Sequence, residues 1–148
     1  MKLKKVAKVE EEDEEQMSLD AVIANPTDLK NRLNVQFVVD TGASMTAITS
    51  EMAKSLGLKY VATAEVGLAD GRVIKVNLAY AYLCIHGEHV FTLVGCGGCD
   101  VPLLGFDVLS LLQLQLDVAN KKVLRPVRRR FKVLRIVWKR VWGDARLG

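Results

Sequence analysis

The chain reads Phe37-Val38-Val39-Asp40-Thr41-Gly42-Ala43-Ser44 at the end of an alternating apolar segment. Val35, Phe37 and Val39 recur at the period of a strand, so a strand is predicted over 33–39 that stops at Asp40. A carboxylate in that place emerges from a rigid, buried element into a loop. Gly42 lets the backbone turn tightly and approach the carboxylate, and the hydroxyls of Thr41 and Ser44 are short enough to orient it. The stretch is typical of a site that holds a reactive carboxylate.

The tripeptide Asp40-Thr41-Gly42 is not specific by itself. From average composition, Asp-(Thr/Ser)-Gly occurs by chance in about one in twenty chains of this length. An ordinary turn capped by Asp40 is the structural alternative. The wider sequence favours the reactive carboxylate. A hairpin turn at Asp70-Gly71 follows about 30 residues later, and Leu103-Leu104-Gly105 then precedes a helix.

Short elements are predicted on both sides of this loop. Residues 19–24 and 45–48 have strand patterns. Ser50 is suited to N-cap a short helix, and Gly57 is suited to the position after the C-terminal end of that helix.

Residues 61–96 read as strands interrupted by two tight turns. Asp70-Gly71 predicts a two-residue hairpin, and residues 86–89 predict a second turn. The strand after the first turn is long, and alternate apolar residues are expected on one face of it: Ile74, Val76, Leu78, Tyr80 and Tyr82.

The last part of the predicted body is apolar and ends in a hairpin. Residues 101–105 end at Gly105, and Asp107 is expected to cap a short helix that runs to Leu112. A final hairpin is predicted over 114–124. Strands dominate, two short helices interrupt them and no long repeat is present, which predicts a mainly β, barrel-like fold.

Together these residues resemble the retropepsin family of aspartic proteases, and most closely its prokaryotic single-domain members. Residues 37–44 are similar to the active-site loop of the family. The hairpin tipped by Ala69, Asp70, Gly71 and Arg72 lies where the family has its flap. Leu103-Leu104-Gly105 resembles the second apolar-apolar-Gly motif. The resemblance covers roughly 19–127 and implies a closed acid-protease-type β-barrel with one or two short helices.

The resemblance implies an aspartic endopeptidase. Such an enzyme needs two carboxylates that share one proton, one acting as base toward a water and the other as acid. The sequence holds one Asp-Thr-Gly, so a homodimer with Asp40 from each chain is expected. The resemblance further implies that Thr41 reaches the partner loop, that Ser44 orients the carboxylate and that the substrate is an extended peptide. No metal or cofactor is expected.

Two positions depart from the retroviral pattern. The tip of the flap is polar where retroviral flaps are rich in glycine. Phe106 stands where retroviral proteases usually have an arginine after the second glycine, as some cellular relatives also permit.

Length and composition place the chain among globular proteins. With 148 residues, half of them hydrophobic, it is long enough for one domain and too apolar to be wholly disordered. No apolar run approaches the roughly 20 residues of a membrane helix, and no secretory signal is evident. Three cysteines favour a reducing, cytoplasmic setting over a disulfide framework.

Charge divides the chain into three parts. Residues 1–16 include six consecutive acids and predict a flexible charged arm. The expected protease domain spans 17–127. Residues 128–148 read as a basic amphipathic tail, with nine Lys/Arg and one acid from residue 125 onward. The tail either packs on the chain's own body or its dimer partner, which we favour, or contacts nucleic acid or a membrane.

Two histidines and two cysteines have the composition of a zinc site. His86 and His89 flank a predicted turn, whereas Cys96 and Cys99 follow the next strand, roughly 20 Å away. Zinc ligands lie about 2 Å from one ion, so no metal site is predicted. A glycine-rich loop is expected between the cysteines, with a short disulfide as the alternative.

A second class of function remains open from the sequence. A retropepsin-like module without catalysis could bind a partner, a membrane surface or nucleic acid through its basic tail. Cleavage that depends on Asp40 discriminates between the two classes.

Overall fold

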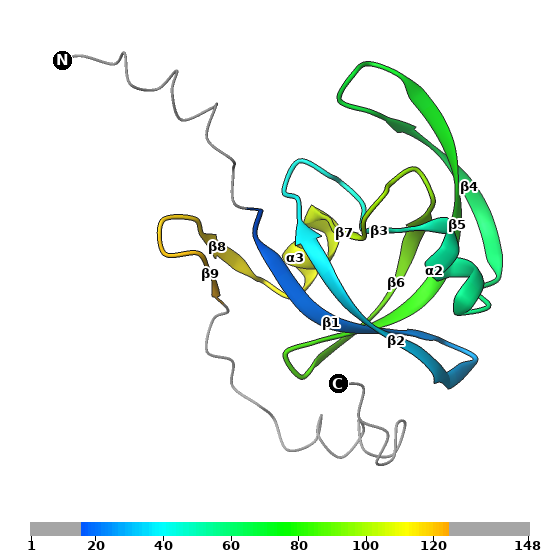
Figure 1. Ribbon diagram of the computed structural model, residues 1–148, viewed down its shortest axis with the longest axis horizontal. Coiled ribbons are helices and arrows are strands. Elements are labelled where there is room, and N and C mark those ends of the chain that lie inside the picture. The colour runs from blue at the N-terminus through cyan, green and yellow to red at the C-terminus, as the bar shows by residue number, and fades with distance from the viewer. Residues whose placement is uncertain (1–15, 125–148) are drawn as a thin grey trace.

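Alternating apolar residues before Asp40 build strand β2 (Asp28–Val39), in which the side chain of Phe37 is fully buried. The computed structural model describes residues 16–124, and Figure 1 shows them as a mainly β body with two short helices. The other elements, in chain order, are β1 (Ser18–Asn25), β3 (Ala47–Ile48), α2 (Ser50–Ser55), β4 (Tyr60–Gly67), β5 (Val73–Ile85), β6 (Glu88–Cys96), β7 (Leu103–Leu104), α3 (Phe106–Leu111), β8 (Gln115–Asp117) and β9 (Lys122–Leu124).

The main sheet closes on itself. Its strand order is β1-β2-β7-β3-β6-β5-β4, with a further pairing between β1 and β5. That pairing aligns Val22 with Cys84 and joins the two sides of the sheet into a ring of six strands, from which β4 extends as the outer partner of β5. The predicted mainly β barrel is therefore confirmed.

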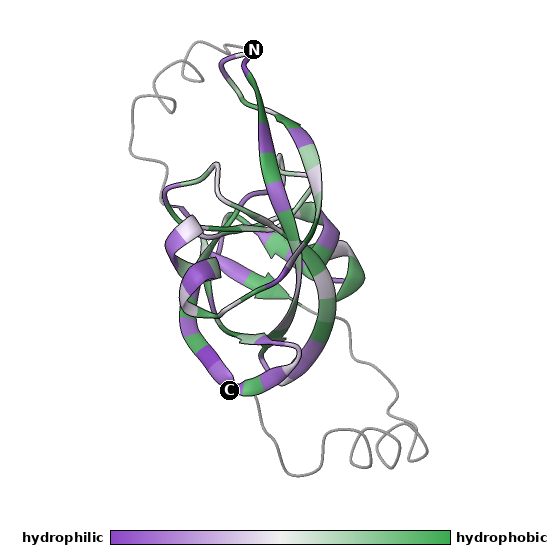
Figure 2. Cartoon of the chain, turned by 90° about the vertical axis from the view of Figure 1, so that its right-hand side faces the viewer, coloured by the Kyte–Doolittle hydropathy of each residue, from purple (hydrophilic) through white to green (hydrophobic). Residues whose placement is uncertain are grey.

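The inward side chains of the ring form the main core. Each helix closes part of it: α2 supplies Ala53, and α3 supplies Val108 and Leu109. Figure 2 shows the alternation of apolar and polar residues along the strands that produces this one-sided burial. Phe37 is the only aromatic residue of this core within residues 16–124.

The β4–β5 hairpin projects from the ring as a flap. Its strands pair from Tyr60↔Ala79 to Gly67↔Val73. The predicted two-residue turn is wrong, because Leu68 N–H donates to Arg72 O at 2.8 Å and leaves three residues at the tip. Gly71 occupies the left-handed region at φ +87°, as a three-residue hairpin with a bulge requires.

The predicted single apolar face of β5 changes environment along the strand. Val76 and Leu78 are buried on the apolar face of the flap, but Tyr80 is 43% exposed. Beyond Leu78 the opposite face points inward, so Ala79 and Ala81 enter the core. The reason is that β5 first forms the flap with β4 and then becomes the wall of the ring between β6 and β1.

Both predicted N-caps are displaced. Thr49 caps α2, and its hydroxyl accepts a hydrogen bond from the Met52 N–H at 3.2 Å, so Ser50 is the first helical residue. Gly105 is the N-cap of α3, and Asp107 lies inside the first turn. Gly57 follows α2 with φ +63°, as predicted.

The other predicted turns are confirmed. His86 and Gly87 both have positive φ in a two-residue turn between β5 and β6. The β8–β9 hairpin forms around Asn120. The predicted arm lies outside the described residues except for the exposed Gln16, and the predicted tail (128–148) lies wholly outside them. No helix in the described residues is long and apolar enough to cross a membrane.

The three cysteines are free thiols, so no disulfide closes the Cys96–Cys99 loop. Cys84 and Cys96 are buried and Cys99 is half-buried. Burial raises the pKa of all three thiols, that of Cys96 to about 11. Because the thiolate is the reactive form, these residues are poorly suited to redox chemistry.

We therefore expect slow alkylation of Cys96 in the folded protein. At pH 8 its rate with iodoacetamide should be on the order of 100-fold below that of a free cysteine. Mass spectrometry of timed samples measures the rate, and the urea-unfolded chain is the control. Equal rates in the folded and unfolded states would contradict the burial of this thiol.

Candidate active site

Asp40 lies at the C-terminal end of β2, where its backbone is fixed from two sides. Its N–H donates to Leu104 O at 3.0 Å, across the parallel pairing of β2 with β7. The preceding Val39 N–H donates to Met17 O at 2.7 Å. Asp40 is therefore held by β7 on one side and, through Val39, by Met17 just before β1 on the other.

The loop after Asp40 turns back onto the carboxylate. Gly42 N–H donates to Asp40 Oδ1 at 3.0 Å, and Ala43 N–H donates to Asp40 O at 3.2 Å. A Cβ atom at position 42 would lie only 3.3 Å from Oδ1. The close approach predicted for this glycine is thus present, and the backbone of the loop orients the half-buried carboxylate.

The hydroxyl groups of the loop do not orient Asp40 within one chain. Thr41 and Ser44 are both exposed, and neither hydrogen-bonds to Asp40 in the described part of the molecule. Within one chain Asp40 Oδ1 accepts from the Gly42 N–H, and the orienting role of Ser44 stays a prediction. The contact of Thr41 with a partner chain stays a prediction.

A buried hydrogen-bond network joins the Asp40 loop to the Leu103-Leu104-Gly105 motif. The Thr46 hydroxyl donates to Asp107 Oδ1 at 2.8 Å and accepts from Gly105 N–H at 3.0 Å. Asp107 Oδ1 also accepts from Thr46 N–H at 3.0 Å. Thr46 is the only fully buried polar side chain in residues 16–124.

Sequence reasoning assigned Asp107 to a helix cap and did not single out Thr46. Their separation of 61 residues leaves no local pattern to detect. The one available signal is that Thr46 lies close after the active-site tripeptide and Asp107 directly after the second motif.

The flap and the active-site loop meet over Gly95 in β6. A Cβ atom there would lie 3.6 Å from Met45 Sδ and 3.7 Å from Val76 Cγ2. The cross-strand pairs on this face of the flap are all apolar: Ala62–Leu78, Ala64–Val76 and Val66–Ile74. The flap therefore presents an apolar surface beside the loop that carries Asp40.

The charged tip residues lie at the far end of this surface. Arg72 Nε donates to Asp70 Oδ2 at 2.6 Å, and Arg72 N–H donates to Asp70 Oδ1 at 3.0 Å. Both side chains are more than half exposed. The structure thus brings Met45 to the flap base, whereas Ala69–Arg72 stay at the tip.

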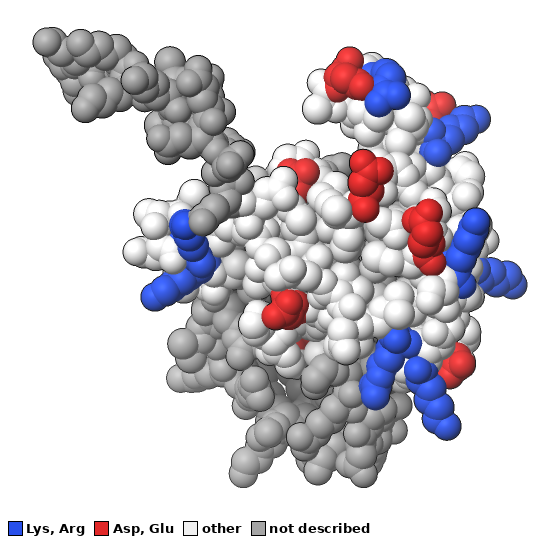
Figure 3. Space-filling view, viewed as in Figure 1, with Lys and Arg blue, Asp and Glu red and all other residues white. Residues whose placement is uncertain are grey.

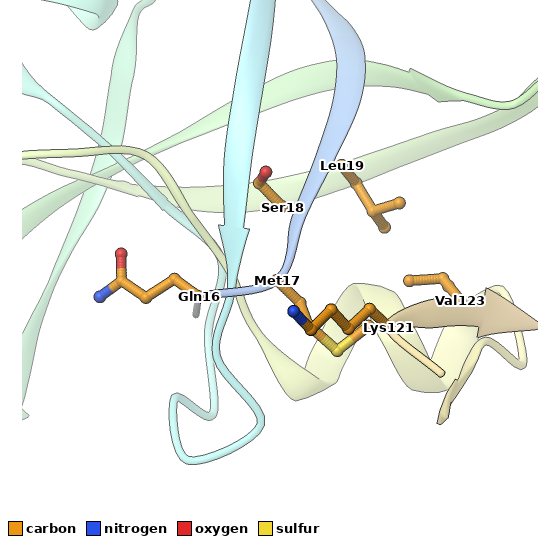
Figure 4. Close-up of a pocket in the computed structure, with 6 residues that line it drawn as sticks. All are labelled: Gln16, Met17, Ser18, Leu19, Lys121 and Val123. Carbon is orange, nitrogen blue, oxygen red and sulfur yellow. The ribbon is translucent and has the colours of Figure 1, made fainter. Parts of the chain in front are cut away.

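Two pockets flank the loop region. One of about 370 Å³ is lined by Thr41 and residues of α3 and the following segment, including Phe106 and Leu116. The other, of about 450 Å³, lies between the start of β1 and the β8–β9 hairpin (Figure 4). Asp40 lines neither of these two pockets.

The candidate zinc ligands are not brought together. His86 and His89 lie at one end of β6, and Cys96 and Cys99 lie at the other. Within residues 16–124, no three His, Cys, Asp or Glu side chains form a group that could hold a metal ion.

Gly105 is expected to tolerate no side chain. A Cβ atom there would lie 2.5 Å from the Met45 carbonyl carbon and 2.7 Å from its oxygen, which are backbone atoms that cannot rotate away. Gly105→Ala should lower the free energy of unfolding by about 3 kcal/mol or prevent folding. Gly67→Ala is the matched control, because nothing lies within 4 Å of its added Cβ. Urea unfolding measures both, and equal stabilities would refute the close packing.

Known proteins resemble this chain in sequence and in fold. A family model described as gag-polyprotein putative aspartyl protease matches residues 26–111, a range that includes Asp40, the flap tip and Gly105. An uncharacterized protein of Rickettsia prowazekii (strain Madrid E) is 32% identical over 85 residues, covering 54% of this chain and 37% of that protein. The chain thus spans little more than a third of that relative's length.

A solved structure shows the same fold. The EIAV protease complexed with the inhibitor HBY-793 superposes with a TM-score of 0.57 at 19% sequence identity. The match covers 71% of this chain and 95% of that chain. The described body therefore corresponds to nearly the whole of that protein.

Proposed function

Because the chain belongs to the family of gag-polyprotein putative aspartyl proteases, we propose that it hydrolyses peptide bonds with Asp40 as its catalytic carboxylate. The observation that carries the proposal is the position of Asp40. It lies at the end of a strand of the ring, with Oδ1 held by the Gly42 N–H at 3.0 Å. This geometry presents a fixed carboxylate at the surface beside an apolar flap.

The chemistry requires a second carboxylate. One carboxylate accepts a proton from water as the water oxygen bonds to the scissile carbonyl carbon, and the other carboxyl group protonates the carbonyl oxygen. As the C–N bond breaks, the first carboxyl group donates the proton that it took from water to the leaving amine nitrogen, and a hydroxyl of the tetrahedral intermediate returns a proton to the second carboxylate as the carboxylic acid product forms. The sequence has one Asp-Thr-Gly, so the second group is Asp40 of another copy at a two-fold axis.

The surface around Asp40 suits such a homodimer. Phe106 is 59% exposed and is tied to the active-site loop, because its N–H donates to Ala43 O at 2.8 Å. The 370 Å³ pocket beside it includes Thr41 and Leu116 in its lining. A two-fold contact at this surface would bury Phe106 and bring the two Asp40 loops together.

The proposed substrate is an extended peptide that lies between the flap and the Asp40 loop. An extended chain can pair its backbone with exposed strand edges, while side-chain pockets select the residues. The apolar rungs from Ala62–Leu78 to Val66–Ile74 favour apolar side chains near the cleaved bond.

Cleavage should depend on Asp40. Purified wild type is expected to cleave an unbiased peptide library between about pH 3.5 and 7, the range in which a carboxylate pair titrates. Asp40→Asn should lower the rate by about 10³-fold or more, because it removes the base and the acid together. Mass spectrometry of the products gives rate and specificity.

Three outcomes of this experiment would count against the proposal. Equal cleavage by both proteins would identify a contaminant. Cleavage reduced only slightly would remove Asp40 from the reaction. No cleavage by a wild type shown to be dimeric would favour a non-catalytic binding module.

Phe106→Glu should separate the dimer without unfolding the chain. Phe106 is exposed and begins α3, where an acidic side chain is compatible with the helix dipole. Burying two glutamates near a two-fold axis is unfavourable, so sedimentation should show monomer and cleavage should be lost together. Val61→Glu, at a 53% exposed position on β4, is the control for dimerisation. A dimeric, active Phe106→Glu protein would place the interface elsewhere.

A further inference from the structure

The outward face of the β5–β6 hairpin carries three aromatic rings in contact, Tyr80, Tyr82 and Phe91, here called the outer aromatic cluster. Phe91 stacks on Tyr80 with ring centroids 4.9 Å apart and an interplanar angle of 13°. The centroid of the Tyr82 ring lies 5.0 Å from that of Phe91, with the two rings tilted by 41°. Tyr80 is 43% exposed and Phe91 is 51% exposed.

The cluster is not explained by the core or by the proposed catalytic site. The ring interior uses one aromatic residue, Phe37, within the described residues. Tyr80 and Phe91 instead stand exposed on the outward face, and only Tyr82 of the cluster packs against the small buried group of Val22, Ala24 and Cys84. Contiguous exposed apolar side chains are candidates for a contact surface.

The sequence after β9 has the composition to cover this surface. Residues 125–148 contain Phe131, Trp138 and Trp142, which include both tryptophans of the protein. The same segment has nine Lys/Arg and one acid, whereas residues 16–124 have eight Lys/Arg and ten acids. The segment and the body therefore have opposite net charges, +8 and −2, and acidic side chains lie among basic ones on the face of the body shown in Figure 3.

The segment is also long enough. Thirteen residues separate Leu124 from Trp138, and that length of chain can span about 40 Å. A body of this size has a radius of gyration of about 13 Å. The tryptophans can therefore reach either face of their own body.

We propose that residues 131–142 pack on the outer aromatic cluster of the same chain. Phe131, Trp138 and Trp142 would cover Tyr80 and Phe91, and the intervening basic residues would face solvent and the acids of the body. The contact would shield the exposed rings from water. It does not depend on catalysis.

Tryptophan fluorescence tests this directly, because every tryptophan lies in the segment in question. In the full-length wild type, acrylamide quenching should be weak and independent of protein concentration. Tyr80→Ser/Phe91→Ser should at least double the quenching constant, because the rings that shield the tryptophans are gone. Val61→Ser removes an equally exposed apolar side chain elsewhere and should leave quenching unchanged.

Far-UV circular dichroism and the urea midpoint establish whether the variants fold. If the double variant does not fold, the single variant Phe91→Ser takes its place. The proposal fails if the wild-type tryptophans are quenched as freely as N-acetyltryptophanamide. It also fails if the double variant shields them as well as wild type does. Shielding lost on dilution would assign the segment to a second copy. Shielding that appears only with phosphatidylglycerol vesicles would assign it to a membrane, and either result overturns the proposal.

Discussion

The Thr46 hydroxyl holds together two loops that lie far apart in the sequence. It donates to Asp107 and accepts from the Gly105 N–H in a fully buried position. Gly105 can approach only because it has no side chain, and Leu104 just before it accepts the hydrogen bond from the Asp40 N–H. A buried hydroxyl with both its donor and its acceptor satisfied is stable, whereas loss of one partner leaves a costly unpaired group. The position of the Asp40 carboxylate therefore depends on contacts between residues that lie more than 60 positions apart in the sequence.

Most of the fold could be predicted from local patterns, because apolar residues alternate with polar ones in strands such as β2. The turn at His86-Gly87 was also predictable, because a two-residue hairpin turn with positive φ at both positions favours glycine. What the sequence could not supply were properties set by tertiary contacts. The N-cap is Thr49 rather than Ser50, and both residue types are favoured N-caps, so local preference does not select the observed one. Tyr80 lies on the same face of β5 as Leu78, as expected, but that face turns outward where β5 joins the ring, so Tyr80 is exposed while Ala79 and Ala81 enter the core.

The candidate site divides in the same way. Asp40 and Gly42 could be identified because a strand, a carboxylate and a glycine occur in sequence order. The backbone approach expected at Gly42 is present as the N–H hydrogen bond to Asp40 Oδ1, whereas the orienting role of Ser44 was assigned by resemblance and stays a prediction. The second carboxylate of the proposed site, from another copy of the chain, is inferred from the chemistry of paired carboxylates. Substitution of Phe106 is the experiment that tests this inference.

Strand β5 also implies a gradient of local stability along one continuous backbone. Residues 73–76 pair only with β4, whereas residues from Asn77 onward pair with β6 and, from Tyr82 to Cys84, with β1 as well. Amides with a strand on one side open more readily than amides between two strands. Hydrogen–deuterium exchange should therefore be fast toward Val73 and slow toward Leu83. The flap can thus fluctuate while the wall that continues from it remains closed, so opening for a substrate need not loosen the ring that positions Asp40.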